Sequence, residues 1–303
     1  MQDNLIKNNH SDVVQSDEQF DKTRQPKVWS TVLLAIVLQP FIFLYLNRPT
    51  LFFVYLIFGV MASVADWSLY LTINLSLIYL AICMCHAYLI AKNYNKMKAR
   101  HWYSRWWGML TIAGAIFIPI FLIRCFLYEP FSIPASSMSP SIEPHDTIIV
   151  KKYGYGDYGT YGITLLNKDV SNDIELQRGK VYAFHPPFTD KNIVYLGRLI
   201  AKPRDKVLIE GNQVSVNGQL LKTRFIDKDT DFRLYEEVSG DTSYNIKIIK
   251  PDVLAPKVDM TVPEDNYFFL GDNRNRSQDS RYWGTVNSSR FVGQVVYVFN
   301  PFK

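Results

Sequence analysis

Apolar residues before position 128 are gathered into four blocks that carry almost no charge. A membrane-spanning helix needs about 20 apolar residues, a length that the third and fourth blocks reach and the first two do not. The pattern predicts three or four transmembrane helices over residues 29–127, with the first two blocks forming either two tight spans or a re-entrant hairpin. The four blocks are Trp29–Leu46, Leu51–Ala65, Leu69–Ala91 and Trp107–Leu127.

The basic residues between the third and fourth blocks set the expected orientation. The loop 92–106 carries lysines and arginines but no acid, so the positive-inside rule predicts that it is cytoplasmic. The fourth block then runs outward, and residues 128–303 lie on the extracytoplasmic side. A polar tail, residues 1–28, precedes the blocks and lacks the features of a secretory signal peptide. Four spans would place this tail outside, and three would place it inside.

After residue 128 the pattern changes to short β-type runs separated by turn signals, which predicts an all-β domain over residues 128–303. Asn217-Gly218 is a strong hairpin signal. Two polar stretches, Gly154–Arg178 and Lys222–Thr261, are expected to form long loops or an inserted subdomain. The candidate strands are Asp146–Tyr153, Lys180–Phe184, Ile193–Ala201, Lys206–Glu210, Gln213–Val216, Tyr267–Leu270 and Phe291–Val298.

Composition narrows the possible partners. The three cysteines, Cys83, Cys85 and Cys125, all lie in apolar blocks, so the outer domain depends on its own core and not on disulfides. Cys83-x-Cys85 is interpreted as a pair of small membrane residues, and no metal or other cofactor is expected. The formal net charge of +5 suits contact with anionic membrane lipid. No basic stripe is interleaved with aromatic residues, so nucleic acid is not an expected partner.

Three segments carry candidate chemistry. Ser137 lies in Ile133-Pro134-Ala135-Ser136-Ser137-Met138-Ser139-Pro140, a few residues after the last apolar block. Further along, Tyr195–Val207 contains an arginine, a proline and an aspartate at close spacing. Tyr267–Gly284 packs acids, an amide and arginines between an apolar run and a tryptophan. Such a cluster can hold a loop rigid through bidentate carboxylate–guanidinium contacts.

In this order, after an outward-running helix, the three segments resemble the bacterial type I signal peptidase (leader peptidase) family. The resemblance covers essentially all of residues 128–303. It implies a multi-span α-helical membrane anchor followed by an all-β catalytic domain of signal-peptidase type, in the bacterial inner membrane. The residues that carry it are Ser137, Met138, Pro140, Asp146 and Lys152; Arg198, Pro203, Asp205 and Val207; and Gly271, Asp272, Asn273, Arg274, Ser277, Asp279, Ser280 and Arg281.

The resemblance implies a serine endopeptidase that removes N-terminal signal peptides from exported pre-proteins after small-x-small motifs. Ser137 would be the nucleophile and Ser277 would orient the base. The implied partners are exported pre-proteins or their signal peptides, membrane lipid and the translocation machinery. Structural support is expected from Asp272, Asp279, Arg281 and Arg198. The implied substrate-binding residues are Phe131, Ile133, Met138, Ile142, Tyr195 and Leu196.

One departure from the family pattern bears on activity. The family's general-base lysine immediately precedes the residue matching Arg198, and here that position is Gly197. Lys202 should point to the opposite face of the strand. Lys191 would lie roughly 20 Å away if extended, at about 3.3 Å per residue. The residues left as possible surrogate bases are Lys151, Lys152, His145 and His185.

Smaller departures concern the residues around these motifs. Ala135 stands where many relatives carry an oxyanion-stabilising hydroxyl, and Arg204 stands where they carry a turn glycine. Three interpretations follow. The chain is a working signal peptidase with an unusual base, a pseudo-peptidase that binds exported polypeptides at the outer membrane face, or a processing protease for one dedicated substrate such as a pilin or conjugation factor.

Overall fold

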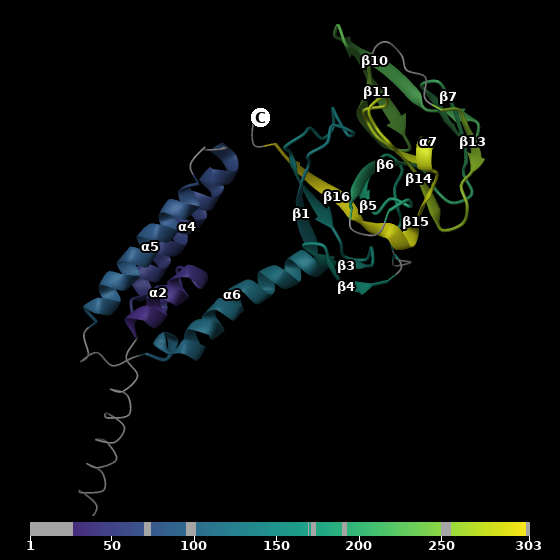
Figure 1. Ribbon diagram of the computed structural model, residues 1–303. Coiled ribbons are helices and arrows are strands. Elements are labelled where there is room, and N and C mark those ends of the chain that lie inside the picture. The colour runs from purple at the N-terminus through teal and green to yellow at the C-terminus, as the bar shows by residue number, and fades with distance from the viewer. Residues whose placement is uncertain are drawn as a thin grey trace, which may run out of the picture. The chain divides into compact units, whose positions relative to one another are not determined.

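The computed structural model describes residues 27–69, 74–94, 101–168, 170, 174–189, 193–249 and 256–300. Most of the predicted tail, residues 1–26, lies outside the described residues. The chain divides into a helical unit that ends at Pro119 and a β unit that begins at Ile120. Figure 1 labels the elements of both units, and each unit is described by itself below.

The helical unit is built on two antiparallel helices, α4 and α5 (Figure 1). Pro49 opens α4, a position where its missing N–H and fixed φ suit the first helical turn. The Asp66 carboxylate accepts hydrogen bonds from the backbone N–H groups of Leu75 and Ser76, at 2.7 and 2.8 Å, and so caps α5. The helices are α2 (Val28–Val37), α3 (Ile42–Tyr45), α4 (Pro49–Leu69), α5 (Leu75–Lys92) and α6 (Trp106–Phe126), with a 3₁₀ turn at Trp102–Ser104.

Three helices within the described residues are long and apolar enough to cross a membrane: Pro49–Asp66, Leu75–Lys92 and Trp106–Phe126. The second apolar block therefore extends further than its composition suggested, because α4 has 21 residues. The first block forms no single long helix, since α2 has 10 residues and α3 has four. This arrangement corresponds to three membrane-length helices preceded by a short helical pair.

The β unit contains a seven-stranded sheet in the order β1-β2-β16-β5-β6-β14-β15, counted over the described residues (Figure 1). A 3₁₀ turn at Ser288–Arg290 precedes the last strand. The short helix α7 (Ser280–Trp283) follows the loop after β14. The strands are β1 (Tyr128–Ser132), β2 (Thr147–Lys151), β5 (Val181–Phe184), β6 (Tyr195–Ala201), β14 (Asn266–Leu270), β15 (Val286–Asn287) and β16 (Phe291–Phe299).

Smaller sheets complete the β unit. The predicted Asn217-Gly218 hairpin is confirmed, because both residues have positive φ and Val216 pairs with Gln219. Of the two polar stretches, the first holds a hairpin, and the second holds a separate three-stranded sheet between β9 and β13, which corresponds to the inserted-subdomain alternative and not to a long loop. The strands are β3 (Asp157–Thr160) with β4 (Ile163–Asn167); β7 (Lys206–Glu210), β8 (Gln213–Val216), β9 (Gln219–Leu220) and β13 (Val258–Thr261); and β10 (Lys222–Lys228), β11 (Phe232–Ser239) and β12 (Thr242–Ile249).

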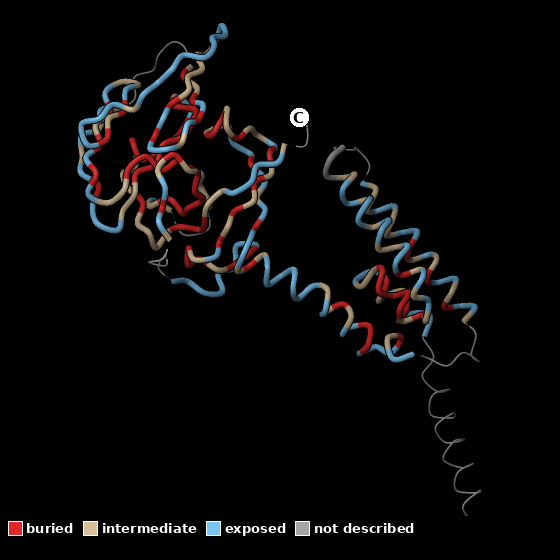
Figure 2. Tube along the Cα trace, turned by 180° about the vertical axis from the view of Figure 1, so that it is seen from behind, coloured by how far each residue is buried: buried red, intermediate tan, exposed pale blue. Residues whose placement is uncertain are grey.

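Two apolar clusters sandwich the large sheet, and alternation along β6 assigns neighbouring residues to opposite clusters. Figure 2 shows the buried residues of the β unit concentrated in its interior strands, with β4 and β10 exposed. The groove-face cluster contains Ile133, Met138, Ile142, Ile148, Val150, Val181, Ala183 and Val292, with Phe131, Val194, Leu196 and Val295 against it. The aromatic cluster contains Tyr155, Leu176, Tyr182, Phe184, Leu199, Phe269, Val286 and Phe291, with Tyr195, Tyr267 and Trp283 among the residues against it.

Candidate active site

Ser137 lies in the segment that connects β1 to β2. The ends of this segment are tied together by hydrogen bonds from the Ile133 N–H to the Asp146 carbonyl and from the His145 N–H to the Ile133 carbonyl, at 3.0 and 2.7 Å. Met138 is buried in the groove-face cluster, whereas Ser137 is half-buried. The burial of Met138 therefore anchors the segment and leaves Ser137 partly exposed beside the cluster.

The loop after β14 contacts the Ser137 segment directly. The backbone N–H of Asn273 donates to the Ser137 carbonyl at 3.0 Å, and the Asn273 side-chain amide donates to the Ser136 carbonyl at 3.0 Å. Ser277 and Ser137 meet at Gly271. A Cβ on Gly271 would lie 2.2 Å from the Ser277 hydroxyl oxygen and 2.7 Å from the Ser137 carbonyl oxygen. Only glycine at position 271 permits this close approach.

Asp279 holds the loop that carries Ser277. Its carboxylate accepts a hydrogen bond from the Gly271 N–H at 3.0 Å and two from the Arg281 guanidinium, each at 2.7 Å. Arg281 also donates to the Arg274 carbonyl at 2.7 Å. Because Asp279 and Arg281 are both buried, these contacts are shielded from water and fix the loop at both ends.

Arg198, which follows Gly197, forms a second buried pair with Asp272, which follows Gly271. The Arg198 Nε donates to Asp272 Oδ1 at 2.7 Å, and its Nη2 contacts Oδ2 of the same carboxylate. Arg198 Nη1 also donates to the Gly179 carbonyl at 2.5 Å. The guanidinium lies over the Tyr244 ring, with 3.9 Å between its carbon and the ring centre. These contacts fasten β6 to the start of the Ser277 loop.

A buried network links the inserted sheet β10–β12 to the same loop. Arg274 pairs with Glu237 of β11, and the Tyr244 hydroxyl of β12 donates to that carboxylate at 2.7 Å. Burial raises the pKa of Tyr244 well above its ordinary value, so it remains a neutral donor. This network could not be predicted from the sequence, because Glu237 and Tyr244 lie in a polar stretch without a regular hydrophobic pattern. The close spacing of Arg274 with the other charged loop residues was the only signal.

Gly197 lies on the face of β6 that is covered by the aromatic cluster. It pairs with Tyr182 of β5. A Cβ at this position would lie 2.8 Å from the Phe269 Cβ and 3.1 Å from the Phe184 ring. The rings of Phe184 and Phe269 stack with 4.5 Å between their centres. Aromatic side chains therefore occupy the space next to Gly197 into which a longer side chain would extend.

The candidate surrogate bases are held elsewhere. Lys152 is buried and donates to Glu129 at 2.9 Å and to the Gly159 carbonyl. Both ring nitrogens of His185 are engaged, one with the Ile193 carbonyl at 2.9 Å and the other with the Asp157 carboxylate at 2.7 Å. Lys202 pairs with Glu175 at 3.1 Å. Within the described part of the chain, the Ser137 hydroxyl makes no recorded hydrogen bond to any lysine or histidine nitrogen.

The other two candidates also point away from a role as base. His145 is exposed and has a φ of 73° in a turn. Lys151 alternates with Val150, which is buried in the groove-face cluster, so its side chain leaves the sheet on the other face. Its strand neighbours are Tyr128 and Gln294.

Most of the expected substrate-binding residues come together. Phe131, Ile133, Met138, Ile142 and Leu196 all belong to the groove-face cluster, and Phe131 and Leu196 remain partly exposed. The sixth residue, Tyr195, does not join them. It faces the aromatic cluster, where its ring meets the edge of Phe188 with 5.9 Å between centres. The reason is the alternation of side chains along β6, which separates Tyr195 from Leu196.

A cavity of about 290 Å³ opens beside Phe131, between β1 and the β3–β4 hairpin. The Lys152–Glu129 and His185–Asp157 pairs line it together with Arg124 and Thr160. Val194 and Val292 contribute to both this cavity and the groove-face cluster. The polar cavity thus borders the groove-face cluster at Phe131 and these two valines.

A model of the family described as "Signal peptidase, peptidase S26" matches residues 104–300. The chain belongs to this family. Signal peptidases of this type are serine endopeptidases, and the geometry around Ser137 lies within the matched region. The helices α2 to α5 lie outside it.

Curated signal peptidases are also similar in sequence. The chain is 30% identical to Signal peptidase I of Buchnera aphidicola subsp. Acyrthosiphon pisum over 235 residues, covering 62% of this chain and 73% of that protein. It is 34% identical to Signal peptidase I of Pseudomonas aeruginosa over 185 residues, covering 58% of this chain and 63% of that protein. A solved structure of a signal peptidase I from Enterococcus faecalis is 28% identical in sequence, with a TM-score of 0.27. The match covers 41% of this chain and 98% of that chain.

Proposed function

We propose that this protein binds the signal-peptide end of exported pre-proteins in the apolar groove beside Ser137. Membership of the signal peptidase family supports removal of signal peptides as the function, and exported pre-proteins are the substrates of such enzymes. The groove-face cluster supports the proposal because the half-exposed Phe131 and Leu196 offer apolar surface next to the buried Met138. An apolar pocket of this kind accepts small side chains and rejects larger ones by steric overlap, which favours small-x-small motifs.

We place the β unit at the outer face of the bacterial inner membrane. Three membrane-length helices and the basic loop before α6 support an arrangement in which α6 runs outward. With three spans, the N-terminal tail is cytoplasmic. A groove close to the outer end of α6 would then meet signal peptides as they leave the membrane.

We further propose that the protein acts as a pseudo-peptidase, binding without cutting. The observation that carries this proposal is the packing of Gly197 against Phe184 and Phe269. A serine hydroxyl needs a base within about 3 Å to become an effective nucleophile. Lys152, His185 and Lys202 have partners other than Ser137, and no hydrogen bond joins the Ser137 hydroxyl to a lysine or histidine nitrogen of the described residues, which supports the absence of a general base.

The competing candidate is a working peptidase whose base comes from an unexpected place. The close approach of Ser277 and Ser137 at Gly271 favours it, because a protein that only binds has less need of this arrangement. The braced loop from Gly271 to Arg281 favours it for the same reason. A processing protease for one dedicated substrate would use the same arrangement.

Site-specific photo-crosslinking tests the binding proposal. The full chain is placed in membranes with a pre-protein that carries a crosslinker beside its small-x-small motif. Leu196→Arg puts a charge into the groove and should abolish crosslinking, while the control Leu220→Arg, at an exposed position on β9, should leave it unchanged. Equal crosslinking by both variants would overturn the proposed groove. Replacing the motif's small residues with Phe should also abolish crosslinking.

A further inference from the structure

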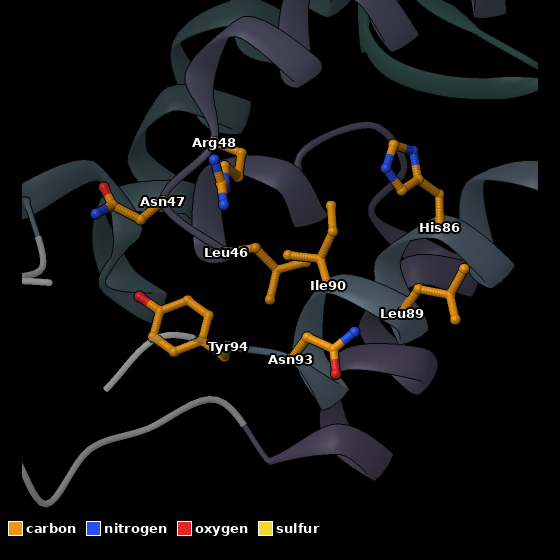
Figure 3. A pocket seen from close by; sticks show the side chains of 8 residues that line it. All are labelled: Leu46, Asn47, Arg48, His86, Leu89, Ile90, Asn93 and Tyr94. Carbon is orange, nitrogen blue, oxygen red and sulfur yellow. The ribbon is translucent and has the colours of Figure 1, made fainter. Parts of the chain in front are cut away.

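The helical unit contains a cavity of about 310 Å³ where the α3–α4 turn meets the end of α5. Figure 3 shows Leu46 and Ile90 at its centre, with polar side chains arranged around them. The cavity lies outside the region that the signal peptidase family model matches. Its lining residues are Leu46, Asn47, Arg48, His86, Leu89, Ile90, Asn93 and Tyr94.

Charge is distributed unevenly along this unit. Between residues 27 and 119 the sequence holds a single acid, Asp66, and that carboxylate caps the start of α5. The cavity lies at the other end of the same helix, beside Asn93 and Tyr94. Lys92 lies in the last turn of α5, at this same end. None of the described residues that line the cavity carries a carboxylate, so none of them neutralises a cation there.

Arg48 supplies that cation. Its backbone is fixed, because its N–H donates to the Phe43 carbonyl at 2.8 Å and its own carbonyl accepts from the Phe52 N–H at 3.2 Å. Its guanidinium is exposed, and among the described residues it has no recorded hydrogen bond or ion pair. A guanidinium is planar and presents several N–H donors whose geometry matches the oxygens of a phosphate group.

His86 adds a second polar group on a fixed ring. Its Nδ1 is hydrogen-bonded to the Tyr55 hydroxyl at 2.8 Å, and the ring packs against Phe43 with 5.6 Å between centres. The ring orientation is therefore set by the helix interior. Side-chain amides of the wall provide further donors, while Leu46, Leu89 and Ile90 provide an apolar side.

The position of the cavity identifies the ligand class. It lies where one membrane-length helix begins and the next ends, which is the level of lipid headgroups. A free phosphate ion would leave the apolar side of the cavity unfilled, whereas a phospholipid has a phosphate group for the polar side and acyl chains for the apolar side. Basic pockets between transmembrane helices on the cytoplasmic side are a recurring way to bind acidic headgroups. We propose that this cavity binds the phosphate group of an anionic membrane phospholipid, with Arg48 as its principal contact.

Binding of dioleoylphosphatidylglycerol to the detergent-solubilised full chain tests the proposal, with native mass spectrometry as the readout. Arg48→Gln should weaken binding of the first lipid by about tenfold or more, because a hydrogen bond to a charged group is lost. Arg105→Gln removes a charge from the same basic region without touching the cavity and is the matched control. It should change binding by about twofold at most.

Two further measurements make the outcome decisive. Ile90→Trp fills the cavity while keeping Arg48, and it should reduce lipid binding as much as Arg48→Gln does. This second variant keeps the proposal testable if Arg48→Gln does not fold. Inorganic phosphate in large excess should not displace the lipid. Native-like binding by both Arg48→Gln and Ile90→Trp, or equal loss in Arg105→Gln, would overturn the site. Displacement by inorganic phosphate would overturn phospholipid as its ligand.

Discussion

Phe269 Cβ lies 2.8 Å from the point at which a Cβ on Gly197 would stand. The atom concerned is the first carbon of a fully buried side chain on a neighbouring strand, and it cannot swing away as the end of a flexible chain could. A residue larger than glycine at position 197 would have to move the strand or the ring stack. The packing around position 197 therefore disfavours any side chain larger than that of glycine.

Gly197→Ala should therefore destabilise the protein. An alanine normally stabilises a strand by about 0.5–1 kcal/mol relative to glycine. Here overpacking should dominate and lower the free energy of unfolding by about 1–3 kcal/mol. Thermal unfolding of the full chain in detergent measures this. Gly114→Ala in α6 is the control, because the nearest atom to its new Cβ lies at 3.6 Å. A native-like or raised stability for Gly197→Ala would contradict the packing described.

Gly271→Ala should separate Ser277 from Ser137. The new Cβ would lie 2.2 Å from the Ser277 hydroxyl oxygen and 2.4 Å from its Cβ, so the loop must shift. We expect a loss of about 3 kcal/mol in the free energy of unfolding. Adding Ser277→Gly removes both of these contacts and should recover part of the loss, which denaturant unfolding of the single and double variants would reveal. Purely additive effects would show that the two residues do not interact.

Arg204→Gly should stabilise the β unit. Arg204 has a φ of 71°, a left-handed conformation that costs a non-glycine residue about 1 kcal/mol. Its ion pair with Glu264 is exposed and contributes little. The turn therefore has the backbone that glycine would adopt, although the sequence departs from glycine here. Arg204→Ala keeps the strain and should give no gain in the unfolding temperature. Equal unfolding temperatures for Arg204→Gly and Arg204→Ala would show that the backbone of Arg204 is not strained.

Alkaline pH should unfold the β unit through its buried tyrosines. Burial raises the pKa of Tyr155, Tyr182 and Tyr244 above the ordinary value. Above about pH 10 the unfolded chain releases phenolic protons that the folded chain retains, so the free energy of unfolding falls as pH rises. Thermal unfolding between pH 8 and 11 should show this decline, with a shallower slope for Tyr155→Phe. A stability that stays constant across this range would contradict it.

The sequence predicted those elements whose signals are local. Lys206–Glu210 and Gln213–Val216 are strands with the expected bounds, and the hairpin at Asn217-Gly218 follows from its dipeptide. β10 of the inserted sheet was not recognised as a strand because every one of its residues is exposed, which removes the alternation that marks a half-buried strand. The length of α4 was underestimated because its last turn passes through polar residues after Ala65.

Some residues of the candidate site could likewise be predicted from the sequence, and others could not. Ser137, Ser277 and the charged loop could be named from their spacing and family resemblance. The surroundings of Gly197 could not be predicted, because Phe184 and Phe269 come from two other strands and reach it only in the folded sheet. Tyr195 was grouped with Leu196 although adjacent residues of a strand face opposite sides. Long-range packing, not local sequence, decides these positions.

Cleavage of a pre-protein by the full chain in membranes tests most directly whether Ser137 lacks a base. The native chain and Ser137→Ala should give the same background, with the precursor intact and still crosslinked in the groove. Gly197→Lys alone should not restore cutting, because Phe184 and Phe269 occupy the space that its side chain needs. Cleavage by the native chain that disappears in Ser137→Ala would contradict the account and establish a working peptidase with another base.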